Sequence, residues 1–223
     1  METEKNYKVS ILLAAYNTID YIRRCLDSIP IRDDVEVVLI DDCSDDGTEI
    51  ELLKYCHTNP NARLIRNKTN IGFALSKNIG YDNCKGEYIT QLDSDDYYVT
   101  AKINDIIDND LKADIVYFDL KSNDGHVWHS EPKTRYIIMD HVSFIKRDLI
   151  GDHRCPNVPW GSGVALNNAI QADLDKKKGS VIYTGKIAYM HSRCPQPPCH
   201  QVWRKEQGQV HTPLRPFSPL LPC

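Results

Sequence analysis

Apolar runs that alternate with amphipathic segments most strongly constrain how this chain can fold. Residues 9–15 form an almost continuous apolar run, as expected of a parallel strand that is covered on both faces. Residues 19–29 then carry apolar side chains at helical spacing, with Thr18 as a candidate N-cap and Pro30 as a stop. A strand, a helix and another strand in succession predict βαβ units. The expected fold class is therefore α/β, with a mostly parallel central sheet flanked by helices.

The same alternation extends along most of the chain before the composition changes. A polar stretch at 123–125 predicts a hairpin turn. Residues 194–223 hold seven of the twelve prolines of the chain. Because proline lacks the N–H that helices and central strands need, this tail is expected to be extended or disordered. The further strands are expected at 35–40, 62–65, 88–92, 115–120 and 181–190, and the further helices at 46–57, 73–83, 102–108 and 164–175.

Charge and hydropathy exclude several classes of function and location. The net charge of −4 and the pI near 6.0 lack the basic footprint of proteins that hold nucleic acid by its phosphates, so no general nucleic-acid binding is expected. No apolar run approaches the ~20 residues that cross a bilayer, and residues 1–8 lack the apolar core of a signal peptide. We therefore expect a cytoplasmic protein without a transmembrane segment, either free or peripheral at the inner membrane surface. Its eight scattered cysteines are then expected to be reduced.

Conspicuous polar residues stand at the ends of the expected strands. In an open parallel α/β sheet, ligands bind beyond the carboxyl ends of the strands, which meet at one rim. We therefore expect one substrate site there. Its candidate residues are Tyr16 and Asn17 after the first strand, Asp41 and Asp42 after the second, Asn70 before a helix, and Asp93, Ser94, Asp95 and Asp96 after the strand at 88–92.

The acidic segment at the last of these strand ends indicates a metal site. Asp93, Asp95 and Asp96 place three carboxylates within four residues. At ~5 Å and an effective dielectric of ~20, each pair repels by on the order of 3 kcal/mol, so a buried version needs a cation. Carboxylate oxygens on alternate residues suit Mn²⁺ or Mg²⁺, which share their other coordination sites with substrate phosphates. A solvated acidic turn remains the alternative for this segment, as do an Asx turn for Asp41 and Asp42 and a packed aromatic for Tyr16.

Four segments follow one another along the chain: Val9–Asn17, Leu39–Thr48, Asn70–Gly72 with Lys77 and Asn78, and Gly86–Asp96. In this order they resemble the family 2 glycosyltransferases of GT-A fold, whose sheet is Rossmann-like. The resemblance covers about residues 7–120. It implies a single GT-A domain over 1–193, with a nucleotide-sugar half at about 7–120 and an acceptor half at about 121–193. It also implies transfer of a sugar from a nucleotide diphosphate sugar, typically a UDP-sugar, to a hydroxyl of an unidentified carbohydrate or lipid-linked acceptor.

The resemblance further implies roles for single residues. The strand end formed by Ala14, Ala15 and Tyr16 would hold the nucleobase and ribose together with Asp42. Lys77, where the family often has arginine, would contact the diphosphate. Asp93 and Asp95 would bind Mn²⁺ or Mg²⁺, with Asp95 as the direct ligand. We therefore expect Asp95 and its neighbour Asp96 to act in catalysis. His191, at the end of an expected strand, can approach the metal or phosphate as a late histidine does in some GT-A enzymes.

The sequence departs from the family pattern at the catalytic base. Family members usually carry an acidic pair that opens a helix in the second half, and Ser162 and Gly163 occupy the comparable place here. Asp148 and Asp152 lie nearby, but their positions are typical of surface or capping residues. The base is therefore unassigned. The alternative function is a nucleotide-sugar-binding protein with weak or no transferase activity.

A nucleotidyltransferase and a zinc-binding protein have less support from the sequence. A nucleotidyltransferase would show a glycine-rich, basic phosphate loop after the first strand, which residues 14–18 do not provide. A zinc site is conceivable at His191, Cys194, Cys199 and His200, but their spacing matches no standard finger.

Overall fold

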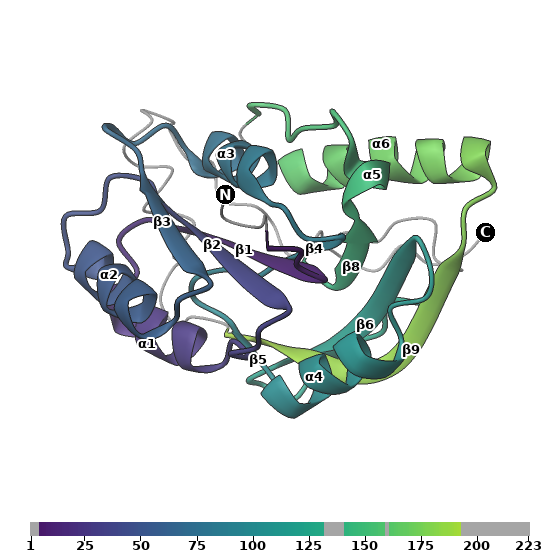
Figure 1. The fold of residues 1–223 in the computed structure, drawn as a ribbon, viewed down its shortest axis with the longest axis horizontal. Helices are drawn as coiled ribbons and strands as arrows, with labels where there is room; N and C mark the ends of the chain where they lie inside the picture. The colour runs from purple at the N-terminus through teal and green to yellow at the C-terminus, as the bar shows by residue number, and fades with distance from the viewer. Residues whose placement is uncertain (1–4, 132–140, 159–160, 193–223) are drawn as a thin grey trace, which may run out of the picture.

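One curled sheet runs through the residues that the computed structural model describes, which are 5–131, 141–158 and 161–192 (Figure 1). The expected proline-rich tail and three members of the conceivable zinc set, Cys194, Cys199 and His200, lie outside these residues. The strands are β1 (Val9–Ala15), β2 (Val35–Asp41), β3 (Ala62–Arg66), β4 (Tyr88–Gln91), β5 (Tyr97–Tyr98), β6 (Ile115–Ser122), β7 (Val127–Trp128), β8 (Ser143–Lys146) and β9 (Val181–His191). The helices are α1 (Ile19–Asp27), α2 (Thr48–Thr58), α3 (Phe73–Asn83), α4 (Thr100–Asn109), α5 (Arg147–Ile150) and α6 (Ser162–Lys177).

The first half of the sheet is the parallel array that the sequence predicts. β1 lies between β2 and β4 and is parallel to both, and β3 extends the array beyond β2. Every residue of β1 and β2 is buried, which explains why both sequences are almost continuously apolar. The carboxyl ends of β2, β1 and β4 are consequently neighbours.

The second half of the sheet is built from antiparallel and long-range pairs. β8 lies between β4 and β6 and is antiparallel to both. β9 runs parallel to β6 and antiparallel to β5, in the order β3-β2-β1-β4-β8-β6-β9-β5 with β7 paired to β6. The pair Tyr98 and Tyr189 therefore brings the end of β9 beside the loop that joins β4 to β5. Residues at the end of β9 therefore lie next to the candidate site described below.

Helices cover both faces of the sheet (Figure 1). Side chains of α1, α2 and α4 pack in one core with the inner residues of β1 and β2. Side chains of α3, α5 and α6 pack in a second core on the other face. Along β6, Phe118 lies in the first core and Tyr117 in the second, as alternation along a strand requires.

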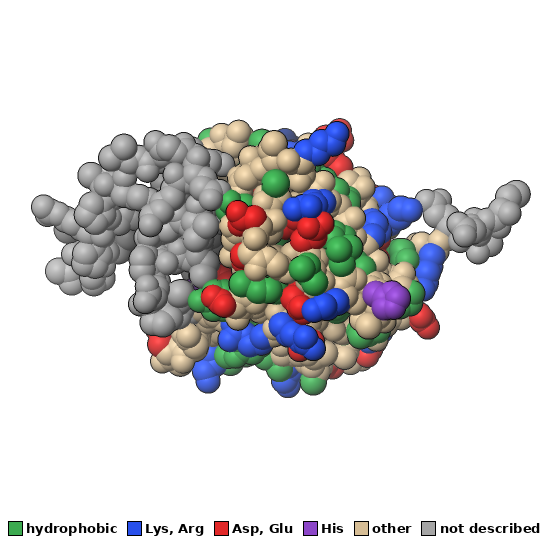
Figure 2. Space-filling model, turned by 90° about the vertical axis from the view of Figure 1, so that its left-hand side faces the viewer, with side chains coloured by type: hydrophobic (Ala, Val, Ile, Leu, Met, Phe, Trp, Pro, Cys, Tyr) green, Lys and Arg blue, Asp and Glu red, His purple; other side chains and the backbone are tan. Residues whose placement is uncertain are grey.

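Three further features concern the surface charge, the hydropathy of the helices and the cysteines of the described residues. The face that carries α1, α2 and β3, turned toward the viewer in Figure 2, mixes basic and acidic side chains rather than gathering one sign. Among the described residues, none of the helices combines the length and the apolar character that a membrane span needs. The cysteines within the described ranges, Cys25, Cys43, Cys56, Cys84 and Cys155, are free thiols.

Candidate functional site

A tight turn at Asp93–Asp96 joins β4 to β5 at the carboxyl end of β4. The backbone N–H of Asp96 donates to the carbonyl oxygen of Asp93 at 3.0 Å. A bond from residue i to residue i+3 closes a β-turn and draws its first and fourth residues together. The turn therefore groups Asp93 with Asp96 rather than with Asp95.

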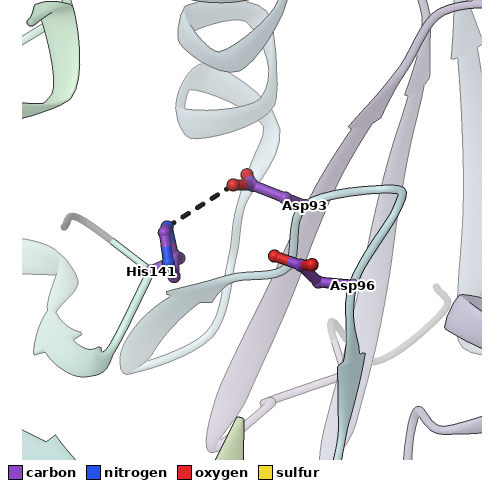
Figure 3. A group of neighbouring side chains, drawn as sticks. All are labelled: Asp93, Asp96 and His141. Atoms are coloured by element: carbon purple, nitrogen blue, oxygen red, sulfur yellow. Dashed lines mark ion pairs between the residues drawn. The ribbon is translucent and has the colours of Figure 1, made fainter. Parts of the chain in front are cut away.

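Asp93, Asp96 and His141 lie together and are called the acidic cluster below (Figure 3). One ligand atom from each residue lies within 4.8 Å of the others. Nδ1 of His141 lies 3.4 Å from Oδ2 of Asp93, and the His141 ring stacks on Tyr189 with centroids 4.6 Å apart. Two carboxylates and an imidazole fit Mn²⁺ well, and the carboxylates also suit Mg²⁺. The residues present therefore fit a divalent cation.

Asp96 is the most firmly held member of the acidic cluster. Its Oδ2 accepts from the Tyr189 hydroxyl at 2.8 Å, and its Oδ1 accepts from the backbone N–H of Ser192 at 2.7 Å. Nδ1 of His191 lies 3.1 Å from Oδ2 of Asp96. Burial raises the pKa of Asp96, but the hydrogen bond from His191 and the charges of His191 and His141 outweigh it, so the pKa is lowered overall. Asp96 is therefore held as a carboxylate.

The sequence-based metal set differs from this cluster in two members. Asp95 is buried, and its carbonyl oxygen accepts from Nη2 of Arg24 at 2.9 Å. His191 contacts Asp96, and that hydrogen bond raises the pKa of the imidazole. Alternate residues share a side only in an extended chain, whereas a turn brings residues i and i+3 together. The roles of Asp95 and His191 as metal ligands stay predictions.

Asp42 ties the end of β2 to the loop before α3. The side chain is completely buried, and its Oδ1 accepts from Nδ2 of Asn67 at 2.7 Å and from the Ile71 N–H at 3.0 Å. Its Oδ2 accepts from the Gly72 N–H at 2.9 Å. Gly72 has a φ of 92°, which a residue with a side chain adopts only under strain. Asp42 thus fixes the 67–72 loop, and its predicted contact with ribose or base stays a prediction.

The other expected site residues lie at the same rim. β1 and β2 pair through Ala15 and Asp41, and the Asp42 N–H donates to the Ala15 carbonyl at 2.9 Å. Asp41 accepts from Nε of Arg66 at 3.1 Å. Of the remaining residues, Ala14, Tyr16, Lys77 and Ser94 are buried, Asn17 and Asn70 are half-buried, and Nζ of Lys77 lies 4.5 Å from the centroid of the Phe73 ring.

The positions considered for a base contain no buried acid. Ser162 and Gly163 form the start of α6, whose first turn has no acidic residue. Asp148 in α5 and Asp152 after it are exposed, in agreement with surface positions. The structure therefore leaves the base unassigned at the start of α6.

His141 is the cluster member that sequence reasoning missed. It lies just before the short strand β8 and 45 positions after Asp96. The residues around it do not form a recognisable metal-binding motif. Only the pairing of β8 between β4 and β6 brings it to the Asp93–Asp96 turn.

Known proteins share the sequence pattern of this chain. The family model described as "Glycosyl transferase family 2" matches residues 10–172. The chondroitin synthase of Escherichia coli is 31% identical over 202 residues, which are 83% of this chain and 28% of that protein. The chondroitin synthase of Pasteurella multocida (strain Pm70) is 43% identical over 91 residues, or 40% of this chain and 9% of that protein. The chain thus spans less than a third of either relative.

A solved structure shows the same fold. The crystal structure of S. aureus TarS 1-349 in complex with UDP-GlcNAc matches with a TM-score of 0.73 and 19% sequence identity. The match covers 85% of this chain and 60% of that chain. The mixed α/β architecture is therefore that of a GT-A glycosyltransferase.

Proposed function

The chain belongs to glycosyl transferase family 2, and on that premise we propose that it transfers a sugar from a UDP-sugar to an acceptor hydroxyl with the help of Mn²⁺ or Mg²⁺. The GT-A fold supports a nucleotide-sugar donor, and the UDP-GlcNAc bound to TarS supports uridine as its base. The names of the two chondroitin synthases support a carbohydrate acceptor, free or lipid-linked. The domain limits 1–193 and a cytoplasmic location stay predictions.

The acidic cluster is the observation that carries this proposal. Asp93, Asp96 and His141 meet beyond the carboxyl end of β4, which lies beside β1 in the sheet. Asp93 and Asp96 would supply oxygen ligands and His141 a nitrogen ligand. When bound, the cation would stabilise the negative charge that develops on the departing diphosphate. Tyr189 and Ser192 hold the Asp96 carboxylate in place for that task.

The rim beside the cluster supplies the nucleotide side of the proposal. Asp42 holds the backbone of Ile71 and Gly72 before α3, which orders the loop at this part of the rim. Lys77 lies on the same helix and is the proposed contact for the diphosphate. The nucleobase would then lie toward the ends of β1 and β2.

Thermal unfolding with nucleotide and metal tests the proposal. UDP should stabilise the chain in Mn²⁺ or Mg²⁺ and not in EDTA, with GDP as the control for the base. At 100 times its dissociation constant a ligand adds ~2.7 kcal/mol, which is several degrees for a chain of this size. UDP-sugar hydrolysis and transfer to a panel of oligosaccharides are measured in parallel. Equal stabilisation in EDTA would contradict the proposed role of the metal ion. No stabilisation in any condition would contradict the proposed UDP-sugar donor.

The second candidate function is binding of a nucleotide sugar without efficient transfer. The start of α6 favours it, because Ser162 and Gly163 replace the acidic pair. Donor-dependent stabilisation with neither hydrolysis nor transfer would support this candidate over the transferase.

A further inference from the structure

A histidine and a buried aspartate form a second titratable group outside the acidic cluster. Asp119 lies on β6 and is 1% exposed. Nδ1 of His129 lies 2.8 Å from its Oδ2, and the backbone N–H of Ser130 donates to its Oδ1 at 2.9 Å. The Tyr183 hydroxyl on β9 donates to the same carboxylate at 2.9 Å. Burial, followed by the contact with Asp119, raises the pKa of Tyr183 to about 12, so the phenol keeps its proton and donates.

These contacts fix the tautomer of His129. A carboxylate can only accept, so in the neutral ring Nδ1 is the nitrogen that carries the proton and Nε2 is the one with the lone pair. The His129 side chain is 68% exposed, so Nε2 is open to an approaching molecule. A buried carboxylate behind an accessible imidazole is the arrangement that turns histidine into a general base, because the carboxylate orients the ring and stabilises the imidazolium.

The strand register places this Asp119–His129 dyad beside the acidic cluster. β6 and β8 pair through Tyr117 and Ser143, and the Phe118 N–H donates to the Val142 carbonyl at 3.1 Å. Continuing this register by two residues from Tyr117 and Ser143 sets Asp119 opposite His141, which lies just before β8. Because neighbouring strands lie ~4.8 Å apart, the backbone of Asp119 is about one strand spacing from that of His141.

A second contact places the residue before His129 near the cluster. Trp128, which precedes His129, contacts the His191 ring with centroids 6.5 Å apart, and His191 contacts Asp96. Trp128 and His129 are successive residues and face opposite sides of the sheet, so this contact places their backbone, and not the His129 ring, near the cluster. Both residues belong to the half of the chain expected to hold the acceptor.

We propose that the Asp119–His129 dyad accepts the proton of the acceptor hydroxyl, and this inference rests on the proposed transferase function. The hydroxyl proton passes to Nε2 of His129 while its oxygen bonds to the anomeric carbon of the donor sugar. The bond between that carbon and the diphosphate oxygen breaks, and its electron pair leaves with the diphosphate. Asp119 stabilises the imidazolium, and the exposed ring then returns the proton to water.

The chain offers a matched control pair. Nε2 of His153 lies 2.8 Å from Oδ2 of Asp173 on α6, which makes a second histidine–aspartate contact. Asp173 is 30% exposed and also accepts from Lys176 at 2.9 Å, so this pair lacks a buried carboxylate. His153→Gln therefore removes the same kind of contact without touching the dyad.

The test compares His129→Gln, His129→Ala, Asp119→Asn and His153→Gln with the wild-type chain in Mn²⁺ and a UDP-sugar. General base assistance contributes ~10²–10⁴-fold, so kcat for transfer, or for hydrolysis with water as acceptor, should fall by that factor in His129→Gln. The UDP-dependent rise in melting temperature and the donor KM should stay unchanged. Added imidazole should restore part of the rate of His129→Ala, and His153→Gln should stay within about twofold of wild type.

The outcomes separate the dyad from the transferase proposal. Wild-type kcat in His129→Gln, with donor binding intact, would overturn the dyad and leave the transferase standing. Absence of both UDP-dependent stabilisation and turnover in the wild-type chain would overturn both. Because His129 is exposed, its variants keep the test valid even if Asp119→Asn fails to fold.

Discussion

The backbone N–H of Asp96 donates to the carbonyl oxygen of Asp93, and this contact decides which carboxylates of the acidic turn meet. It brings the first and fourth residues of the turn together, and β8 places His141 opposite them. The ligand set therefore depends on a turn and on a long-range strand pair. Asp95, between them in sequence, is the residue that the family resemblance favours.

Neutralising one carboxylate at a time should identify the metal ligands. We expect Asp93→Asn to abolish the part of the UDP-dependent stabilisation that needs Mn²⁺. Without metal, its melting temperature should change little, because the loss of the contact with His141 offsets the removal of one repulsive charge from the cluster. Asp95→Asn should keep most of the metal-dependent stabilisation. Loss of it in Asp95→Asn, with retention in Asp93→Asn, would make Asp95 the direct ligand instead.

The parallel half of this fold is predictable from the sequence because local pattern and burial coincide there. β1 and β2 are buried on both faces, so their apolar runs reveal them directly. β5, β7 and β8 have two to four residues each, too few to show any period. The pairing of β8 between β4 and β6 depends on contacts across the chain.

The sequence likewise predicts some residues of the candidate site and not others. The rim residues follow strands that the sequence reveals, so the family motifs locate them. His141 reaches the acidic cluster through the pairing of β8, and no short motif marks it. The same holds for Asp119 and His129, which meet through the pairing of β6 and β7. Thr18 shows a smaller difference: it is the N-cap of α1, but its side chain makes no capping hydrogen bond. The first N–H of the helix, that of Ile19, donates to Oδ2 of Asp46 at 2.9 Å.

Asp42→Asn should weaken both the fold and donor binding. An amide nitrogen in place of one oxygen cannot accept from the N–H groups of Ile71 or Gly72, so one buried donor is left unpaired. That costs ~1–3 kcal/mol of the free energy of unfolding, measured by urea titration. Asp45→Asn in the loop after β2 is the control, because Asp45 is exposed. Equal stability of the two variants would show that the 67–72 loop does not depend on Asp42.

Gly86→Ala should destabilise the chain through a backbone clash. A Cβ at Gly86 would lie 2.4 Å from the Ser10 nitrogen and 2.6 Å from the Val9 carbonyl carbon, so β1 and β4 would have to separate. We expect a loss of at least ~1–3 kcal/mol, as for overpacked cores. Gly125→Ala meets no atom within 4 Å and should cost only the strain of its φ of +91°. A smaller loss for Gly86→Ala than for Gly125→Ala would contradict the clash.

Asp114 should make the chain less stable in acid. Hydrogen bonds from the Ser180 backbone and from Lys146 lower the pKa of Asp114 from 3.8 to about 2. A folded pKa below the unfolded one adds stability that is present above pH ~4 and is lost as the pH falls toward 2. The full shift corresponds to roughly 2 kcal/mol, and screening by solvent at this partly exposed carboxylate reduces it to about 1 kcal/mol. Asp114→Asn should therefore flatten the pH dependence of the urea midpoint between pH ~4 and ~2, and an unchanged slope would remove Asp114 as its source.

The dyad and the missing acidic pair make one joint prediction. Ser162→Glu with Gly163→Asp puts carboxylates in the first turn of α6, where the helix dipole favours them by ~0.3–1 kcal/mol, so the variant should fold. If His129 already accepts the proton, this double change should raise kcat for transfer less than ~10-fold in the wild-type background. In His129→Gln it should restore ~10²-fold or more, because the new carboxylate then supplies the missing base. Such unequal effects are what a double-mutant cycle measures between groups that share one task. Equal large gains in both backgrounds would mean that the wild-type chain lacks a base and that the dyad does not serve as one.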